Sequence, residues 1–172
     1  MLNIMDGLIT LVAKYFILIP FAVSAYVFLR LNKTKRQEML ILLFCTGVLS
    51  LIFAKIGAHI YNDPRPYISD GTPALFQHSG DPNGFPSDHT LLSSFLAFIV
   101  LTYSRRLGIF LLVVAALVGW ARVAAHVHHA ADIAGSFVFT GLAYLIVIKL
   151  LENKKIASWF RTNRHSRHKE NN

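Results

Sequence analysis

Long apolar stretches alternate with short polar or basic stretches along this chain. Each apolar stretch is close to the roughly 20 residues that an α-helix needs to cross a bilayer. The pattern predicts five membrane-spanning helices, at about residues 8–30, 38–60, 89–103, 107–125 and 131–151. The third is short, so we expect it to extend, to tilt or to lie where the bilayer is thinned. The expected fold class is therefore an all-α, polytopic membrane helix bundle of about five transmembrane spans.

The composition agrees with a membrane protein. Hydrophobic residues make up 54% of the 172 positions, charged residues make up 15%, and the mean hydropathy is +0.48. These values disfavour a soluble globular class. The first residues lack the basic start of a signal peptide, so we expect the first apolar stretch to be retained. The single cysteine, Cys45, lies within an apolar stretch and is interpreted as a small buried side chain.

The net charge of +8 has to be interpreted from the positions of the cations. Most of the 17 lysines and arginines lie at the ends of the first, third and fifth predicted spans or after them: Arg30, Lys33, Lys35, Arg36, Arg105, Arg106, Lys149, Lys154, Lys155, Arg161, Arg164, Arg167 and Lys169. The positive-inside rule makes that side cytoplasmic. No pattern typical of a nucleic-acid-binding module is present. We therefore expect a transmembrane domain at residues 1–152 and a basic cytoplasmic tail at residues 153–172.

Four cations do not belong to these basic clusters: Lys14, Lys55, Arg65 and Arg122. A cation inside a span costs about 2.5–3.5 kcal/mol on insertion scales, so such a residue indicates a functional site by default. Lys14 is interpreted as snorkelling outward from the first span. The other three lie toward the outer ends of spans or in the outer connection at residues 61–88. We expect them to converge at the outer interface of the membrane.

Three segments, residues 55–66, 85–90 and 122–132, add reactive side chains to this outer face. They supply three cations, several imidazoles, a hydroxyl and a carboxylate. Such groups stabilise the negative oxygens of a transferring phosphoryl group without requiring a metal. Ser87 directly precedes the third span, where free N–H groups favour a bound anion. An ordinary helix N-cap is the alternative role of this serine.

Spacing distinguishes the histidines of the third segment. His128 and Asp132 are four residues apart, so on a helix the carboxylate can orient the imidazole and leave its other nitrogen for attack. His129 is three residues from Asp132 and remains a second candidate, while His126 either shapes the pocket or has no role. A metal site built from these side chains is disfavoured, because neighbouring cations repel a metal and no His-Glu-x-x-His motif or cysteine pair is present.

The three segments resemble the signature motifs of the type 2 phosphatidic acid phosphatase superfamily. Its pattern is Lys-x6-Arg-Pro, then Pro-Ser-Gly-His, then Ser-Arg-x5-His-x3-Asp. The matching residues, within a resemblance that covers roughly residues 38–150, are Arg65-Pro66, Pro86-Ser87-Asp88-His89, and Arg122, His128 and Asp132. Three positions depart from the pattern: Lys55 precedes Arg65 by ten positions rather than seven, Asp88 replaces Gly, and Ala121 replaces Ser.

The resemblance implies a role for each matching residue. As catalytic residues, His128 attacks phosphorus to form a phosphohistidine, Asp132 orients it, and His89 protonates the leaving oxygen. The implied phosphate-binding residues are Arg65, Arg122, Ser87 and Lys55. The resemblance implies no metal and no other cofactor, and the expected partners are a lipid phosphate or pyrophosphate and the surrounding membrane lipids. The oligomeric state is not indicated.

The Pro-Ser-Asp-His variant is similar to that of bacterial undecaprenyl pyrophosphate phosphatases of the bacitracin-resistance type. We therefore expect hydrolysis of undecaprenyl pyrophosphate to undecaprenyl phosphate and phosphate at the outer face of the bacterial cell membrane, which recycles the carrier lipid of peptidoglycan synthesis. A phosphatidylglycerophosphate or phosphatidic acid phosphatase is the alternative enzyme. A non-catalytic lipid-phosphate binder or transporter is less favoured, because binding does not require the His128–Asp132 pair and the spans show no duplicated halves.

Overall fold

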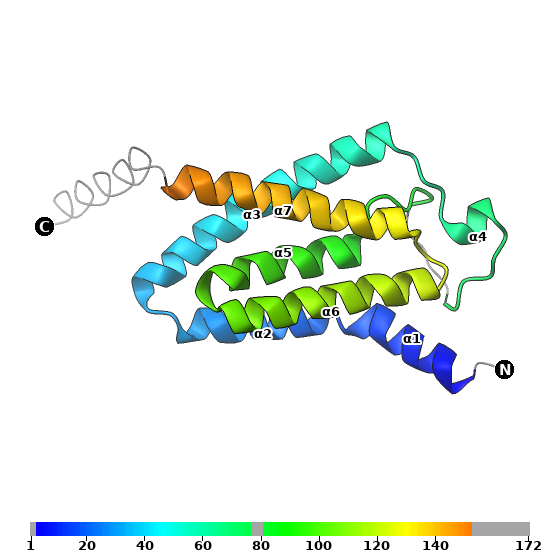
Figure 1. The fold of residues 1–172 in the computed structure, drawn as a ribbon, viewed down its shortest axis with the longest axis horizontal. Coiled ribbons are helices and arrows are strands. Elements are labelled where there is room, and N and C mark those ends of the chain that lie inside the picture. The colour runs from blue at the N-terminus through cyan, green and yellow to red at the C-terminus, as the bar shows by residue number, and fades with distance from the viewer. Residues whose placement is uncertain (1–2, 77–80, 153–172) are drawn as a thin grey trace, which may run out of the picture.

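The structure, a computed structural model, describes residues 3–76 and 81–152. Within these ranges the chain forms helices joined by connections, and it contains no β-strand (Figure 1). The helices are α1 (Ile4–Tyr15), α2 (Leu18–Arg30), α3 (Lys33–Ile60), α4 (Pro66–Ser69), α5 (Asp88–Tyr103), α6 (Arg105–Ala124) and α7 (Ala130–Glu152). The expected all-α class is confirmed, and the expected basic tail lies outside the described residues.

The expected spans correspond to helices of the structure. Within residues 3–76 and 81–152, four stretches are long and apolar enough to cross a membrane: Ile4–Arg30, Lys33–Ile60, Arg105–Ala124 and Ala130–Glu152. The third expected span is α5, which has only 16 residues. At about 1.5 Å per residue it is roughly 24 Å long, less than the roughly 30 Å of a hydrocarbon core. Helix α5 is therefore the short third span that the sequence predicts.

The first expected span is interrupted between α1 and α2. The interruption is at Phe16 and Ile17, which lie between the two helices. Pro20 explains its position, because a proline lacks an N–H group and its ring clashes with the carbonyl of the residue four positions earlier, here Phe16. The expected span over about 8–30 therefore corresponds to one apolar stretch, Ile4–Arg30, which two successive helices form.

Helix α5 lies at the centre of the bundle and packs against α6, α7, α3 and α2 (Figure 1). Its contacts are close because small side chains line them. At the α5–α6 contact, a Cβ on Gly108 would overlap the backbone of Leu101. At the α5–α7 contact, the Ser94 and Thr140 hydroxyls lie 2.9 Å apart and are hydrogen-bonded. This packing fixes the position of the first residues of α5 relative to the end of α6 and the start of α7.

The two ends of the bundle differ in the groups they carry. One end holds the α2–α3 and α5–α6 corners, with the basic residues of those corners (Figure 1). There Arg36 closes the first corner by donating to the carbonyl oxygens of Phe28 and Leu29, at 3.0 and 2.6 Å. The other end holds α4, the connection that precedes α5, and the α6–α7 turn. The candidate site lies at this second end.

Candidate active site

The turn after α6 returns the chain toward the helix that it has just left. His126 has a φ of +57°, in the left-handed region that terminates many helices. The Val127 N–H then donates to the Arg122 carbonyl at 3.2 Å. The turn is held from outside by the Leu75 N–H, which donates to the Ala125 carbonyl at 3.1 Å. As a result His128, which follows this turn, lies against Arg122.

The contacts of His128 define which of its ring nitrogens carries the proton. Its Nε2 lies 3.1 Å from a terminal nitrogen of Arg65 and 3.4 Å from one of Arg122. A guanidinium only donates, so Nε2 accepts and is the ring nitrogen that carries the lone pair. Its Nδ1 therefore bears the hydrogen and donates to Asp132 Oδ2 at 3.0 Å. This arrangement of base, orienting carboxylate and two cations is that of an activated nucleophile beside an anion site.

Arg65 is held in place by backbone carbonyl groups. Its side chain is only 4% exposed, and it donates through Nε to Asp81 O at 2.8 Å and through Nη1 to Val127 O at 2.9 Å. Arg122 is 2% exposed and lies over the Phe76 ring, 5.6 Å from its centroid. Among the residues that the structure describes, no carboxylate is hydrogen-bonded to either of these buried guanidiniums, which favours an anionic ligand.

Lys14 lies closer to the site than the sequence indicated. Its ammonium group is 4.5 Å from the centroid of the Phe76 ring, the same ring that Arg122 contacts. Cations within about 6 Å of an aromatic face are attracted by its quadrupole. The interpretation of Lys14 as a merely snorkelling residue missed this contact, because it depends on the 71–76 connection folding back over α1.

Asp132 is fully buried and joins the turn to the start of α5. Its Oδ2 accepts from the His129 backbone N–H at 2.9 Å, in addition to His128. Its backbone carbonyl accepts from the Ser87 N–H at 3.3 Å, and the Ser136 hydroxyl donates to the Ser87 carbonyl at 3.0 Å. These bonds place Ser87 beside the His128–Asp132 pair. Ser87 is the N-cap residue of α5, but its side chain makes no capping hydrogen bond, and its hydroxyl accepts from Thr90.

His89, Asp88 and Lys55 differ in how far they are exposed to solvent. His89 is half-buried in the first turn of α5, two residues after Ser87. Asp88 is exposed, and its charge attracts Arg122. Lys55 is exposed on α3. The structure thus brings Ser87 of the second motif and Arg65 together with Arg122, His128 and Asp132 of the third motif.

Burial and charge both lower the pKa of His128 below its ordinary value. Desolvation is the largest cause, and Arg122 and Arg65 act in the same direction, while Asp132 opposes them. The neutral imidazole is therefore favoured. A neutral imidazole is the form that can attack phosphorus.

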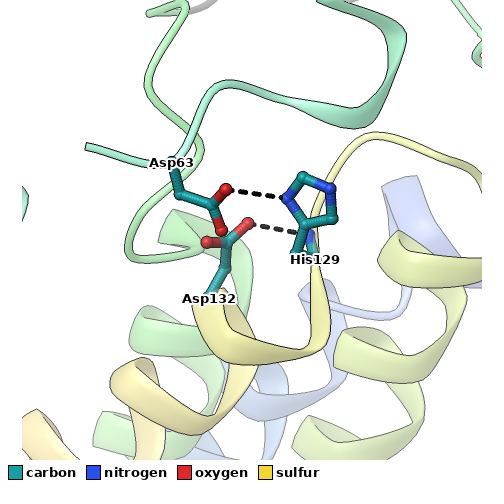
Figure 2. Close-up of side chains that lie close together, drawn as sticks. All are labelled: Asp63, His129 and Asp132. Carbon is teal, nitrogen blue, oxygen red and sulfur yellow. Dashed lines mark hydrogen bonds and ion pairs between the residues drawn. The ribbon is translucent and has the colours of Figure 1, made fainter. Parts of the chain in front are cut away.

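Asp63 is a site residue that the sequence did not single out. Figure 2 shows its carboxylate beside Asp132 and the His129 ring; Asp63 Oδ1 is 3.0 Å from His129 Nδ1. Burial, and then the charge of Asp132, raise the pKa of Asp63, whereas His129 lowers it. His129 reaches Asp132 only through its backbone N–H, so its ring is paired with a different carboxylate from that of His128. These contacts therefore favour His128 over His129 as the candidate nucleophile.

An apolar groove lies next to this centre, between α3 and α7. Its volume is about 340 Å³, and its walls include Phe53, Ile56, Ile60, Phe85, Phe139 and Leu142. The Phe85 ring packs edge-on against Phe139, with the ring centroids 5.7 Å apart. Phe85 precedes Ser87 by two residues, and the preceding Gly84 packs against Asp132. One short segment therefore forms both a wall of the groove and a side of the polar centre.

Comparisons with known proteins agree on one family and one fold. The model described as the PAP2 superfamily matches residues 38–156. Undecaprenyl-diphosphatase BcrC of Bacillus subtilis (strain 168) is 24% identical over 136 residues, which cover 79% of this chain and 69% of that protein. Bacitracin transport permease protein BcrC of Bacillus licheniformis is 29% identical over 127 residues. That match covers 73% of this chain and only 62% of the relative.

Two solved structures are similar to the whole bundle. Aquifex aeolicus LpxE has a TM-score of 0.65 at 21% identity, over 86% of this chain and 87% of that one. The first transmembrane PAP2 type phosphatidylglycerolphosphate phosphatase from Bacillus subtilis has a TM-score of 0.56 at 22% identity, over 88% of this chain and 76% of that one. At these identities the likeness concerns the fold.

Proposed function

Because the chain belongs to the PAP2 superfamily, we propose that this membrane phosphatase hydrolyses undecaprenyl pyrophosphate to undecaprenyl phosphate and inorganic phosphate. In this proposal the reaction passes through a phosphohistidine at His128. The site faces the outside of a bacterial cell membrane, and the product re-enters peptidoglycan synthesis as the carrier lipid. Family membership supports a phosphatase; the contacts of the site support the particular mechanism.

The observation that carries the proposal is the position of His128 Nε2. This nitrogen accepts hydrogen bonds from Arg65 and Arg122, while Nδ1–H is held by Asp132. A phosphoryl group bound by the two guanidiniums would therefore lie next to the lone pair of Nε2. Preorganised cations at the place where charge develops stabilise a phosphoryl-transfer transition state, and removing one such donor typically costs about 10²–10³-fold in rate.

The first step transfers the terminal phosphoryl group to the protein. Nε2 of His128 forms a bond to the terminal phosphorus, and the bond from that phosphorus to the bridging oxygen breaks. His89 donates a proton to the leaving undecaprenyl phosphate. Asp132 stabilises the positive charge that develops on the imidazole of His128, because its carboxylate already accepts from Nδ1–H.

The second step returns the protein to its starting state. A water molecule gives a proton to His89 and attacks the phosphorus of the phosphohistidine. The P–N bond breaks, inorganic phosphate leaves, and Nε2 regains its lone pair. In this proposal Ser87 contributes to phosphate binding from the start of α5. Lys55 contributes from α3, which requires its exposed side chain to bend toward the site.

The apolar groove supports a lipid substrate rather than a soluble phosphate ester. Its walls are aliphatic and aromatic side chains, and it lies beside the segment that carries Ser87. A polyprenyl chain in the groove would leave its pyrophosphate next to the polar centre. Burial of apolar chain contributes roughly 25 cal/mol per Å², so the groove adds affinity for a lipid that a soluble ester lacks.

A comparison of lipid substrates tests the proposed function. Phosphate release from undecaprenyl pyrophosphate, phosphatidylglycerophosphate and phosphatidic acid is measured with the purified full chain in one detergent. We expect the highest kcat/KM for the pyrophosphate. Rapid acid-free quenching should also trap a phosphoryl-protein that is labile in acid and stable in alkali, as a phosphohistidine is. A higher kcat/KM for either monophosphate lipid would replace the proposed substrate, and an acid-stable phosphoryl-protein would contradict the proposed intermediate.

A further inference from the structure

We propose that Asp63, His129 and Asp132 form a binding site for a divalent transition-metal ion of the zinc class, and that the bound ion inhibits the phosphatase. The three residues each offer one ligand atom, and these atoms lie within 4.8 Å of one another (Figure 2). Zinc holds nitrogen and carboxylate-oxygen ligands at about 2.0–2.2 Å, which puts the ligand atoms about 3–4 Å apart. The cluster therefore needs only a small contraction to close around an ion.

A buried oxygen without a partner supports this site independently of the clustering. Asp132 is 0% exposed, and among the described residues its Oδ1 has no hydrogen-bond partner. Its other oxygen, Oδ2, is already used by His128 and the His129 backbone. A buried carboxylate oxygen without a donor is costly. The Asp63 carboxylate lies close enough to Asp132 for the two negative charges to repel each other, which adds to the cost of burying Asp132. A cation bound between the two carboxylates would remove this repulsion.

The chemistry of the ligands indicates which ions fit. One imidazole and two carboxylates form a set that binds zinc and similar transition ions, whereas Mg²⁺ and Ca²⁺ prefer oxygen ligands alone. His129 is 33% exposed, so an ion can reach its ring from water. The Asp70 carboxylate lies 4.0 Å from the other ring nitrogen of His129. A carboxylate behind a ligating imidazole is the usual second partner of such a histidine.

The neighbouring arginines do not occupy this site. Arg65 and Arg122 approach Nε2 of His128, whereas Asp132 is bonded to Nδ1 on the opposite side of the same ring. From sequence alone, repulsion by the neighbouring cations disfavours a metal. In the structure, the negative charges of the Asp63 and Asp132 carboxylates offset the repulsion between the proposed ion and the two arginines.

Inhibition follows from the double use of Asp132, and this part rests on the proposed function. An ion bound at the unpartnered Oδ1 of Asp132 draws negative charge away from Oδ2, the oxygen that accepts from Nδ1–H of His128. The carboxylate then balances less of the positive charge that develops on the imidazole during attack. The ion is therefore an inhibitor and not a cofactor, so EDTA treatment should leave the basal rate of phosphate release unchanged.

Metal binding is tested without any lipid. The full chain in detergent is treated with EDTA, dialysed, and titrated with Zn²⁺ against a chromophoric zinc indicator. We expect His129→Gln and Asp63→Asn each to weaken the tightest binding step at least tenfold. His59→Gln, which changes an exposed histidine of α3 outside the cluster, is the matched control and should bind as the unmodified chain does. Equal affinity in all four proteins would overturn the site.

Inhibition is tested separately. With undecaprenyl pyrophosphate as substrate, Zn²⁺ should inhibit the unmodified chain reversibly, and the half-inhibiting concentration should rise at least tenfold in His129→Gln. Thermal melting of each variant in detergent identifies a variant that fails to fold. If His129→Gln fails to fold, the same shift in half-inhibiting concentration is measured in Asp63→Asn. If the unmodified chain binds Zn²⁺ and the two variants do not, but Zn²⁺ does not inhibit the unmodified chain, the inhibitory role is overturned. Absence of any hydrolysis by the metal-free chain would instead contradict the proposed function and leave the binding result intact.

Discussion

The Nδ1 atom of His128 lies 3.0 Å from Oδ2 of Asp132, and both side chains are almost completely buried. This contact joins the end of the α6–α7 turn to the first turn of α7. The left-handed residue His126 makes it possible, because it reverses the chain after α6. The His128–Asp132 contact thus depends on how α6 ends and α7 begins. It orients the ring of His128 so that Nε2 faces Arg65 and Arg122.

The first prediction separates the two neighbouring histidines. We expect His128→Ala to reduce phosphate release from undecaprenyl pyrophosphate by at least about 10³-fold, because it removes the proposed nucleophile. His129→Ala should retain most of the activity, because its backbone N–H still donates to Asp132. Both variants should extract and run on size exclusion as the unmodified chain does. An inactive His129 variant beside an active His128 variant would mean that the nucleophile is assigned to the wrong ring.

The second prediction concerns pH. In the proposed mechanism only neutral His128 attacks phosphorus, and the pKa of His128 is lowered below 6.5 by burial and by the two arginines. The neutral form therefore persists at lower pH, and the acidic limb of kcat/KM should lie below pH 6.5. Arg65→Gln removes one cation that lowers this pKa, so the limb should move to higher pH, while the rate falls about 10²–10³-fold. Arg30→Gln, at the opposite end of the bundle, is the control. A shift to lower pH in Arg65→Gln would contradict the proposed environment of His128.

The third prediction tests the apolar groove as the site of the lipid chain. Ile56→Trp places a bulky ring in the groove, whereas Leu117→Trp places one on the exposed face of α6. We expect Ile56→Trp to lower kcat/KM for undecaprenyl pyrophosphate about tenfold, which corresponds to about 1.4 kcal/mol. Hydrolysis of a short, soluble phosphate ester should be unchanged, as should both activities of Leu117→Trp. Equal losses for the long and short substrates would exclude the groove as a chain-binding site.

The membrane fold could be predicted from sequence because hydropathy directly records which helices contact lipid. Two local details of the helices could not be predicted from hydropathy. Pro20 divides the first span at Phe16, a consequence of proline geometry that the apolar pattern masks. Asn32 extends α3 back to Lys33 by accepting from the Lys35 N–H, so this helix begins before its apolar part.

The site could be predicted in part, for a physical reason. The spacing of His128 and Asp132 lies within one turn, where sequence separation determines distance. Asp63 pairs with His129 across two connections that are far apart in sequence, and no local spacing indicates such a contact. The approach of Lys14 to Phe76 is of the same kind. Contacts between helix ends depend on the whole bundle, so they required the structure.

The fourth prediction concerns orientation in the membrane. In a Cys45→Ala background, Asn62→Cys places a thiol on the exposed connection at the site end of the bundle. We expect it to react with a membrane-impermeant thiol reagent in intact cells, because the basic corners are expected on the cytoplasmic side. Asn163→Cys, in the predicted cytoplasmic tail, should react only after permeabilisation. The reverse pattern would place the site in the cytoplasm and make recycling of an outward-facing pyrophosphate untenable.

The last prediction concerns Asp88, where the second motif departs from the superfamily pattern. Asp88 is the exposed first residue of α5, and its carboxylate attracts Arg122, one of the two arginines at Nε2 of His128. A single phosphoryl group must compete with that carboxylate for Arg122. A pyrophosphate brings additional negative charge and a phosphate leaving group that needs less protonation than an alkoxide, so it depends less on a fully available Arg122.

We therefore expect Asp88→Gly to narrow the preference for pyrophosphate over monophosphate lipids. The measurement is kcat/KM for undecaprenyl pyrophosphate and phosphatidic acid, with both proteins in one detergent. A tenfold fall in the ratio would correspond to about 1.4 kcal/mol of differential transition-state stabilisation. Asp70→Gly, which removes another exposed carboxylate, one that lies 4.0 Å from Nε2 of His129, is the control and should leave the ratio unchanged. An unchanged ratio in Asp88→Gly would mean that this carboxylate acts only on the start of α5, where an acidic residue favours the helix dipole, and that substrate choice is made elsewhere in the site.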